Sequence, residues 1–260
     1  MKKQLALLAL FVLFFTGAAF ANSAIVTSLT GTVQVQTGTA AARTLRQGDE
    51  VRQGDTVITA AASSVILKFQ DGQVAALTAN SRMAINTYQY NANTGAGSVL
   101  LSLLNGGMRA ITGLIGRAQP SQVAYRAGTA TIGIRGTDTS VYFAGGDIVV
   151  TVSEGAVTFA YAGRSVIIRA GEGVNARRDG TFQQGAAQQI IRTVPPDIAA
   201  LVGGLQGLTE AIQQAAKPPG QTGQPGQPGG DTGQPGLPPG QTPSPNNPPG
   251  GAGGGSASNR

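Results

Sequence analysis

Residues 65–77 read Val-Ile-Leu-Lys-Phe-Gln-Asp-Gly-Gln-Val-Ala-Ala-Leu, two short apolar runs on either side of Asp71-Gly72. Valine, isoleucine and phenylalanine favour the extended backbone of a β-strand. An Asp-Gly pair accepts the positive φ angles that a tight turn between antiparallel strands requires. The stretch therefore predicts two strands, residues 65–69 and 74–77, which a two-residue turn at Asp71-Gly72 joins into a hairpin.

Short β-rich runs of the same kind, separated by glycine turns, extend from Ser23 to about Phe182. In residues 32–36 (Thr-Val-Gln-Val-Gln) the valines alternate with polar residues, as in a strand with one buried face. So many short strands predict an all-β fold, a two-sheet sandwich of the jelly-roll type or one with solenoid-like coiling. Further glycine turns are predicted at Asn105-Gly106, Gly145-Gly146, Glu154-Gly155 and Asp179-Gly180.

A short repeat lies ahead of the hairpin. Residues 46–57 read Arg-Gln-Gly-Asp-Glu-Val-Arg-Gln-Gly-Asp-Thr-Val, so Gly48-Asp49 recurs as Gly54-Asp55. Glycine supplies unusual backbone angles, and aspartate accepts backbone N–H bonds within a turn. The repeat predicts two successive bends that carry the chain from one sheet to the other. The alternative is a Ca²⁺ site that uses the two aspartates and Glu50, although the repeat lacks the dense ligand spacing of a calcium loop.

A second glycine motif lies further along the chain. In residues 130–137 (Ala-Thr-Ile-Gly-Ile-Arg-Gly-Thr) the isoleucines alternate with Gly and Arg, so the predicted strand has one apolar and one nearly bare face. Gly136 permits a bend before the next strand. Arg135 is either solvated or paired with Asp138 or Glu154. The motif residues that serve as turns or as partner contacts are Gly48, Asp49, Gly54, Asp55, Asp71, Gly72, Arg135, Gly136, Thr137, Glu154 and Gly155.

The composition excludes most catalytic chemistry. The chain has no Cys and no His, which rules out disulfides, thiolate metal sites and nucleophiles activated by His. Paired carboxylates remain, but the candidates lie beside turns, where acids form local hydrogen bonds. We therefore expect no enzymatic activity, no metal site and no cofactor. These acids are Asp138, Asp147, Glu154 and Glu172.

The N-terminus predicts export. Two lysines follow Met1, residues 5–15 are apolar throughout, and Ala19-Phe20-Ala21 fits a small-x-small cleavage site. Residues 1–21 are therefore a predicted signal peptide, which places the mature protein in the periplasm or outside the cell without a membrane span. The formal charge of +6 falls to +4 once the two lysines leave. The remaining arginines are scattered, so we expect no nucleic-acid partner.

The C-terminal part changes character twice. After the predicted β-domain, residues 22–195, apolar residues recur every three or four positions and predict an amphipathic helix over residues 196–217, with Asp197 as its cap. This helix either docks on the β-domain or binds a partner. Residues 218–260 are rich in Pro and Gly and have no aromatic residue, so they predict a disordered tail.

Eight motifs in this order resemble a FecR domain, the envelope-side module of bacterial iron-uptake regulators, over about residues 25–175. The resemblance implies an all-β, non-enzymatic domain that acts through protein contacts. FecR regulators also have a cytoplasmic, Trp-containing segment, whereas this chain has no Trp. It therefore resembles a freestanding exported FecR-like protein. The motifs are residues 31–35, 48–49 with 54–55, 57–59, 67–72, 106–109, 130–137, 152–157 and 170–172.

These observations together predict a binding or signalling module of the bacterial cell envelope with an envelope protein as its partner. One alternative is a carbohydrate or peptidoglycan binder, for which Tyr88 and Tyr90 are the best exposed aromatic candidates. The other aromatic residues of the predicted strands, such as Phe69, Tyr142 and Phe159, are expected to be buried. A further alternative is a self-assembling surface or matrix protein.

Overall fold

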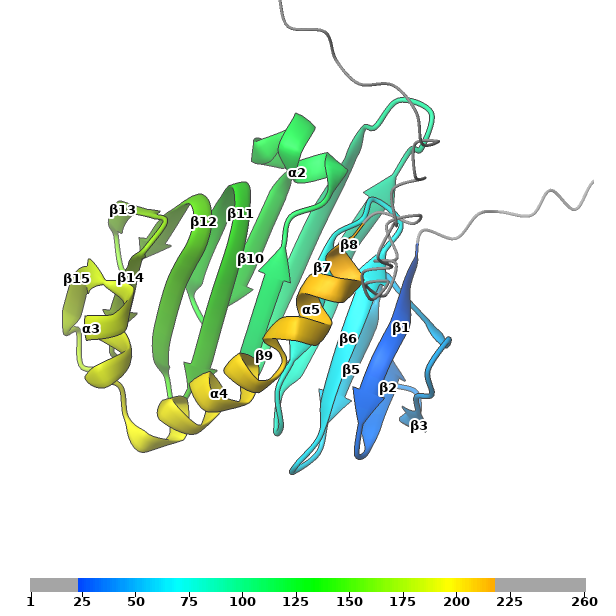
Figure 1. Ribbon diagram of the computed structural model, residues 1–260, viewed down its shortest axis with the longest axis horizontal. Coiled ribbons are helices and arrows are strands. Elements are labelled where there is room, and N and C mark those ends of the chain that lie inside the picture. The colour runs from blue at the N-terminus through cyan, green and yellow to red at the C-terminus, as the bar shows by residue number, and fades with distance from the viewer. Residues whose placement is uncertain (1–22, 218–260) are drawn as a thin grey trace, which may run out of the picture. The chain divides into compact units, whose positions relative to one another are not determined.

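The computed structural model describes residues 23–217 (Figure 1). The predicted signal peptide, residues 1–21, and the predicted tail, residues 218–260, lie outside the described residues. Strands dominate the described part, so the all-β prediction is confirmed. The strands are β1 (Ser23–Thr30), β2 (Val33–Thr37), β3 (Arg43–Thr44), β4 (Glu50–Arg52), β5 (Asp55–Thr59), β6 (Ser64–Phe69), β7 (Val74–Leu77), β8 (Arg82–Tyr90), β9 (Gly97–Ile111), β10 (Val123–Ala127), β11 (Ala130–Ala144), β12 (Asp147–Tyr161), β13 (Arg164–Arg169), β14 (Glu172–Ala176) and β15 (Phe182–Ala186).

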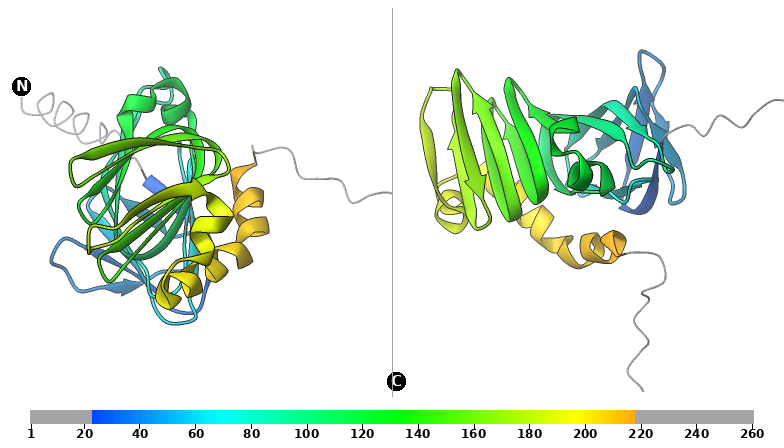
Figure 2. Two further views of the ribbon diagram at one scale, coloured as in Figure 1. Left: turned by 90° about the vertical axis from the view of Figure 1, so that its left-hand side faces the viewer. Right: turned by 90° about the horizontal axis from the view of Figure 1, so that it is seen from above.

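All these strands belong to one hydrogen-bonded network of 15 strands. Their pairing divides the network into two layers (Figure 2, left). Layer I runs in the order β3, β2, β5, β8, first half of β9, β10, first half of β11, second half of β12 and β13. Layer II runs in the order β4, β1, β6, β7, second half of β9, second half of β11, first half of β12, β14 and β15.

The three longest strands, β9, β11 and β12, pass from one layer to the other. Each contains 15 residues and bends at a glycine with positive φ: Gly106 (+99°), Gly136 (+59°) and Gly155 (+76°). Strand partners change at these points, and the register of β11 against β12 shifts between Arg135 and Thr139. The predicted strand ends at Asn105-Gly106 and Glu154-Gly155 are therefore wrong, because a glycine bend redirects a strand without ending its hydrogen bonding.

The predicted hairpin at Asp71-Gly72 forms, between β6 and β7. Its loop has three residues rather than two, because the Phe69 N–H donates to the Gln73 carbonyl at 2.8 Å. Gly72 has a φ of +83°, the left-handed conformation that ends such a loop. The β11–β12 hairpin at Gly145-Gly146 has the predicted two-residue loop, with both φ angles positive.

The core fills the space between the two layers. It is built from inward-facing aliphatic side chains and from aromatic residues that include Phe69, Tyr125 and Phe159. Several short strands were not expected from the sequence, namely β3, β4, β5 and β15. Strands β3 and β4 have only two and three residues, so their extended form depends on the neighbouring strands rather than on their own sequence.

Helices cover the outer face of layer II (Figure 2, right). Ile198, Val202 and Leu205 of α4 pack on β11 and β12, and Ile212 of α5 packs on β6 and β7. The predicted single helix is thus two helices, broken at Leu208, and both dock on the β-domain. Asp197 is not a cap: the N-cap is Pro195, and Asp197 lies in the first turn. The helices are α2 (Leu114–Ala118), the 3₁₀ turn η1 (Pro120–Gln122), α3 (Ala187–Arg192), α4 (Pro196–Gly207) and α5 (Thr209–Ala216).

Within residues 23–217, every helix is too short or too polar to cross a lipid bilayer.

Candidate functional site

The structure distributes the predicted motif residues over three places. The Gly-Asp repeat lies in the corners around β4, the Asp71-Gly72 turn lies between β6 and β7, and residues 135–137 with Glu154-Gly155 lie at the bends of β11 and β12. The last two places are connected, because α2 lies between them: the Leu114 N–H donates to the Asp71 carbonyl, and Arg117 is next to the β11 bend. The Gly-Asp repeat is separate from both.

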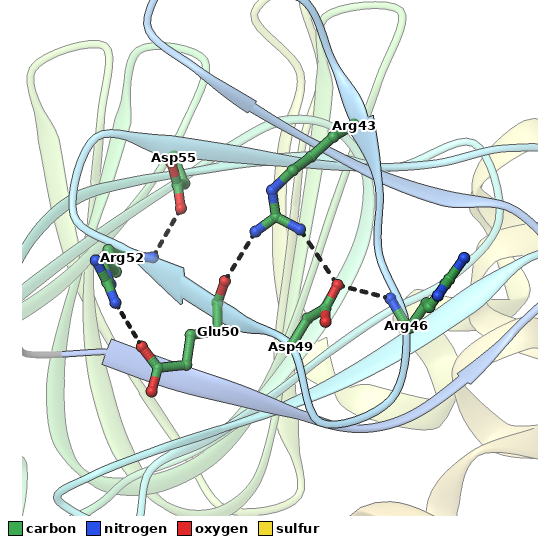
Figure 3. A network of polar contacts seen from close by, with 6 residues as sticks. All are labelled: Arg43, Arg46, Asp49, Glu50, Arg52 and Asp55. Atoms are coloured by element: carbon green, nitrogen blue, oxygen red, sulfur yellow. Dashed lines mark hydrogen bonds and ion pairs between the residues drawn. The ribbon is translucent and has the colours of Figure 1, made fainter.

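The Gly-Asp repeat forms two corners of the same design (Figure 3). Asp49 accepts from the Arg46 N–H at 3.0 Å, and Asp55 accepts from the Arg52 N–H at 2.8 Å. Pairing shows what the corners do: β3 and β5 lie in layer I, whereas β4 between them lies in layer II. The first corner therefore leads the chain into layer II, and the second leads it back.

The acidic side chains of the two corners accept hydrogen bonds from neighbouring side chains. The Arg43 guanidinium donates to Asp49 at 3.2 Å, the Arg52 guanidinium donates to Glu50 at 2.8 Å, and the Thr37 hydroxyl donates to Asp55. Within residues 23–217 no three metal-binding side chains of the His, Cys, Asp and Glu types converge. The geometry thus favours turn formation over the Ca²⁺ alternative.

Asp71 is a buried carboxyl group that links the hairpin to β8 and to the first turn of α2. Its Oδ1 accepts from the Tyr88 hydroxyl and from the Gln73 N–H, both at 3.2 Å, and the Tyr88 hydroxyl accepts from the Asp71 N–H at 3.0 Å. Burial raises the pKa of Asp71 above its ordinary 3.8, although these hydrogen bonds oppose the shift. A Cβ at Gly113 would lie 2.3 Å from the Asp71 carboxylate, so only glycine fits there.

The three motif residues at the β11 bend differ in their exposure to solvent. Arg135 is exposed on the outer face of layer I, Gly136 forms the bend, and Thr137 is buried. The Thr137 N–H donates to the Thr112 hydroxyl at 2.9 Å, which ties the bend to the end of β9. Opposite this bend, Gly155 has no room for a side chain, because a Cβ there would lie 2.1 Å from the Gly136 carbonyl oxygen. Thr137 and Gly155 therefore hold the bends together, whereas the Arg135 side chain remains exposed.

The predicted pairing of Arg135 with Asp138 is wrong. Asp138 is buried in layer II and forms a bidentate ion pair with Arg109 of β9. The bend at Gly136 lies between Arg135 and Asp138 in the chain, so Arg135 belongs to layer I and Asp138 to layer II. Sequence reasoning missed this ion pair, because Arg109 and Asp138 are 29 residues apart and nothing local connects them.

Arg135 lines a groove of about 880 Å³ on the outer face of layer I. Strands β10, β11 and β12 form its floor with the small residues Ala124, Gly133 and Thr158, which are cross-strand neighbours. One wall comes from α2 and η1, including Arg117. The lining residues are Gly116, Arg117, Pro120, Ser121, Val123, Ala124, Thr131, Gly133, Ile134, Arg135, Gly136 and Thr158.

The two tyrosines predicted to form an exposed sugar-binding face do not do so. Tyr88 is 1% exposed, and Tyr90 packs against the core. The reason is a bulge in β8, where the pairing with β9 shifts between Ile85 and Thr87. A bulge reverses the alternation of side chains, so Tyr88 and Tyr90 face the core after it, whereas Gln89 is exposed. Phe69, Tyr142 and Phe159 are buried, as expected.

Comparisons with known proteins agree with the motifs. The model of the family described as FecR protein matches residues 55–158, a segment that contains every residue lining the groove. Two crystal structures of a candidate anti-sigma factor from Parabacteroides distasonis resemble this chain, with TM-scores of 0.43 and 0.41 at 16% and 14% identity. In both cases the alignment covers 52% of this chain and 62% of the other.

The chain thus spans less than two thirds of those crystallised proteins. No curated protein matches its sequence. The family match extends from β5 into the second half of β12 and lies within the range of the ordered motifs. This part of the chain contributes strands to both layers and forms the groove. Residues 55–158 of this protein thus match the FecR family.

Proposed function

We propose that this protein is an exported, non-enzymatic binding or signalling module of the bacterial cell envelope that acts through protein contacts. The FecR domain supports the regulatory class. The export signal predicted over residues 1–21 supports the location.

One observation supports the location of the contact site: helices cover the outer face of one layer and leave that of the other open. Helices α4 and α5 bury the outer face of layer II, while the outer face of layer I is open at β10, β11 and β12. Ile167 of β13 continues this open face and is 46% exposed. An open, partly apolar sheet face beside a groove is typical of a surface that binds a partner.

Three of the four acids considered for catalysis are engaged in other contacts. Asp138 is held by Arg109, Asp147 accepts from the Arg178 N–H at 3.0 Å, and Glu172 accepts from the Arg169 N–H at 2.9 Å. These contacts support the non-enzymatic part of the proposal, because a glycosidase needs two carboxyl groups that face a shared substrate.

Photo-crosslinking in cells tests this proposal. A photoreactive amino acid would replace Thr131, on the open face of layer I, or Gln206, on the exposed side of α4, as the matched control. We expect a discrete adduct with another envelope protein from position 131 and none from position 206. Absence of an adduct from position 131 would contradict the proposal. An adduct made of two copies of this chain would support the self-assembly alternative instead.

A further inference from the structure

We propose that the groove between α2–η1 and the outer face of layer I binds an acidic segment of a partner polypeptide. This inference rests on the proposed function and names the chemistry of its contact site. The proposal is supported by three features of the groove: two arginines, a floor of small side chains and the lack of aromatic residues.

The groove is positively charged. Arg117 and Arg135 both line it, and its lining contains no Asp and no Glu. Neither arginine takes part in the ion pairs found within residues 23–217, which use Arg43, Arg52 and Arg109. A guanidinium group without an acidic neighbour is available for bidentate hydrogen bonds to a carboxylate from outside.

The floor of the groove is open to a polypeptide backbone. Ala124, Gly133 and Thr158 lie side by side across three strands, so no long side chain rises from the centre. Gly133 is not required for folding: its φ is not positive, and a Cβ there would meet only Thr158, at 3.8 Å. Its missing side chain therefore leaves space in the groove rather than relieving strain.

The lining favours a polypeptide over the other anionic polymers. Sugar-binding faces and single-stranded nucleic-acid sites rely on aromatic stacking, and no aromatic residue lines this groove. Two arginines also give far fewer contacts than the phosphate backbone of a duplex requires. Acidic side chains carried on a polypeptide match both the charge and the bare floor.

The test uses the full-length exported protein and a short fluorescent peptide of alternating Glu and Thr, with fluorescence anisotropy as the measurement. A peptide of alternating Gln and Thr is the control for charge. We expect binding of the Glu peptide only. Replacing both groove arginines, Arg117→Ala with Arg135→Ala, should weaken it by about tenfold or more.

Matched variants separate the groove from overall charge. Arg46→Ala with Arg192→Ala removes the same charge from two exposed positions outside the groove and should leave binding unchanged. Gly133→Val should block the floor and abolish binding while the protein stays folded. Gly185→Val, at another glycine with ordinary φ and no close neighbour, should have no effect on binding.

Equal binding of the Glu and Gln peptides would overturn the proposal, as would equal losses in the two double-arginine variants. Polygalacturonate serves as the glycan probe. If Arg117 and Arg135 are needed for its binding but not for peptide binding, the groove is a glycan site and the proposal is wrong. A negative peptide assay alongside a protein adduct from position 131 would reject this inference and leave the proposed function standing.

Discussion

Arg109 and Asp138 form a buried, bidentate ion pair, with Nε to Oδ1 at 2.8 Å and Nη2 to Oδ2 at 2.6 Å. The Arg109 Nη1 also donates to the Thr209 hydroxyl at 3.1 Å, so the same guanidinium joins β9, β11 and the start of α5. The hydrogen bond to Asp138 raises the pKa of Arg109, and burial opposes that shift. The pair therefore links layer II to the helices that cover it.

Removal of one partner of this pair should be strongly destabilising. The two side chains are 11% and 6% exposed, so Asp138→Ala would leave an almost buried positive charge. We expect a loss of about 3–5 kcal/mol in the free energy of unfolding, measured with urea. Replacing both residues with apolar ones, Arg109→Met with Asp138→Leu, should cost much less. A loss under about 1 kcal/mol for Asp138→Ala would show that the ion pair is not a structural link.

Asp71 should give the protein a pH-dependent stability. Because burial raises its pKa above 3.8, the folded state binds the proton more tightly than the unfolded state does. The contribution of Asp71 is thus fully present below its unfolded pKa and is lost as pH rises through its folded pKa. The stability of Asp71→Asn relative to the native protein should accordingly increase with pH above about 4.

Urea unfolding of both proteins from about pH 2 to about pH 8 measures this difference. Asp179 is the control with the opposite sign, because hydrogen bonds from Thr181 lower its pKa. Its contribution is present above the unfolded pKa and is lost as pH falls through the folded one, so Asp179→Asn should gain relative stability only in acid. Parallel stability curves for the native protein and Asp71→Asn would contradict the assignment to Asp71.

The bends at Gly136 and Gly155 should respond unequally to the same substitution. Both glycines have positive φ, so an alanine at either position should cost about 1–2 kcal/mol from the backbone alone. The Cβ at position 136 would enter open space, whereas at position 155 it would meet the Gly136 carbonyl oxygen at 2.1 Å. Gly155→Ala should therefore cost about 3 kcal/mol or more, as measured by chemical unfolding. Equal losses would show that the two bends do not approach each other closely.

The two C-terminal segments should contribute very differently to stability. Removal of residues 218–260 should leave the melting temperature almost unchanged, because their composition offers no apolar surface to bury. Removal of residues 196–260 should lower it sharply, since Ile198, Val202 and Ile212 fill the outer face of layer II. Scanning calorimetry of the two truncated proteins compares them. A fall of several degrees on removal of the tail alone would mean that the tail packs on the domain.

The local features of the fold could be predicted from the sequence alone. The hairpin at Asp71-Gly72 and the two-residue turn at Gly145-Gly146 depend on residues adjacent in the chain, as does the alternation that buries Val33 and Val35. The two corners of the Gly-Asp repeat belong to the same class, because each aspartate binds the N–H three residues before it. The ordered motifs also pointed to the FecR domain without a structure.

Tertiary structure decided the features that depend on distant partners. Whether the chain ends or bends a strand at Gly106, Gly136 or Gly155 depends on which strands lie beside it in each layer. The β8 bulge turned Tyr88 inward, and the 29-residue separation hid the pairing of Arg109 with Asp138. The groove likewise exists only because α2 lies beside β10 and β11, a long-range arrangement that periodicity and turn chemistry do not encode.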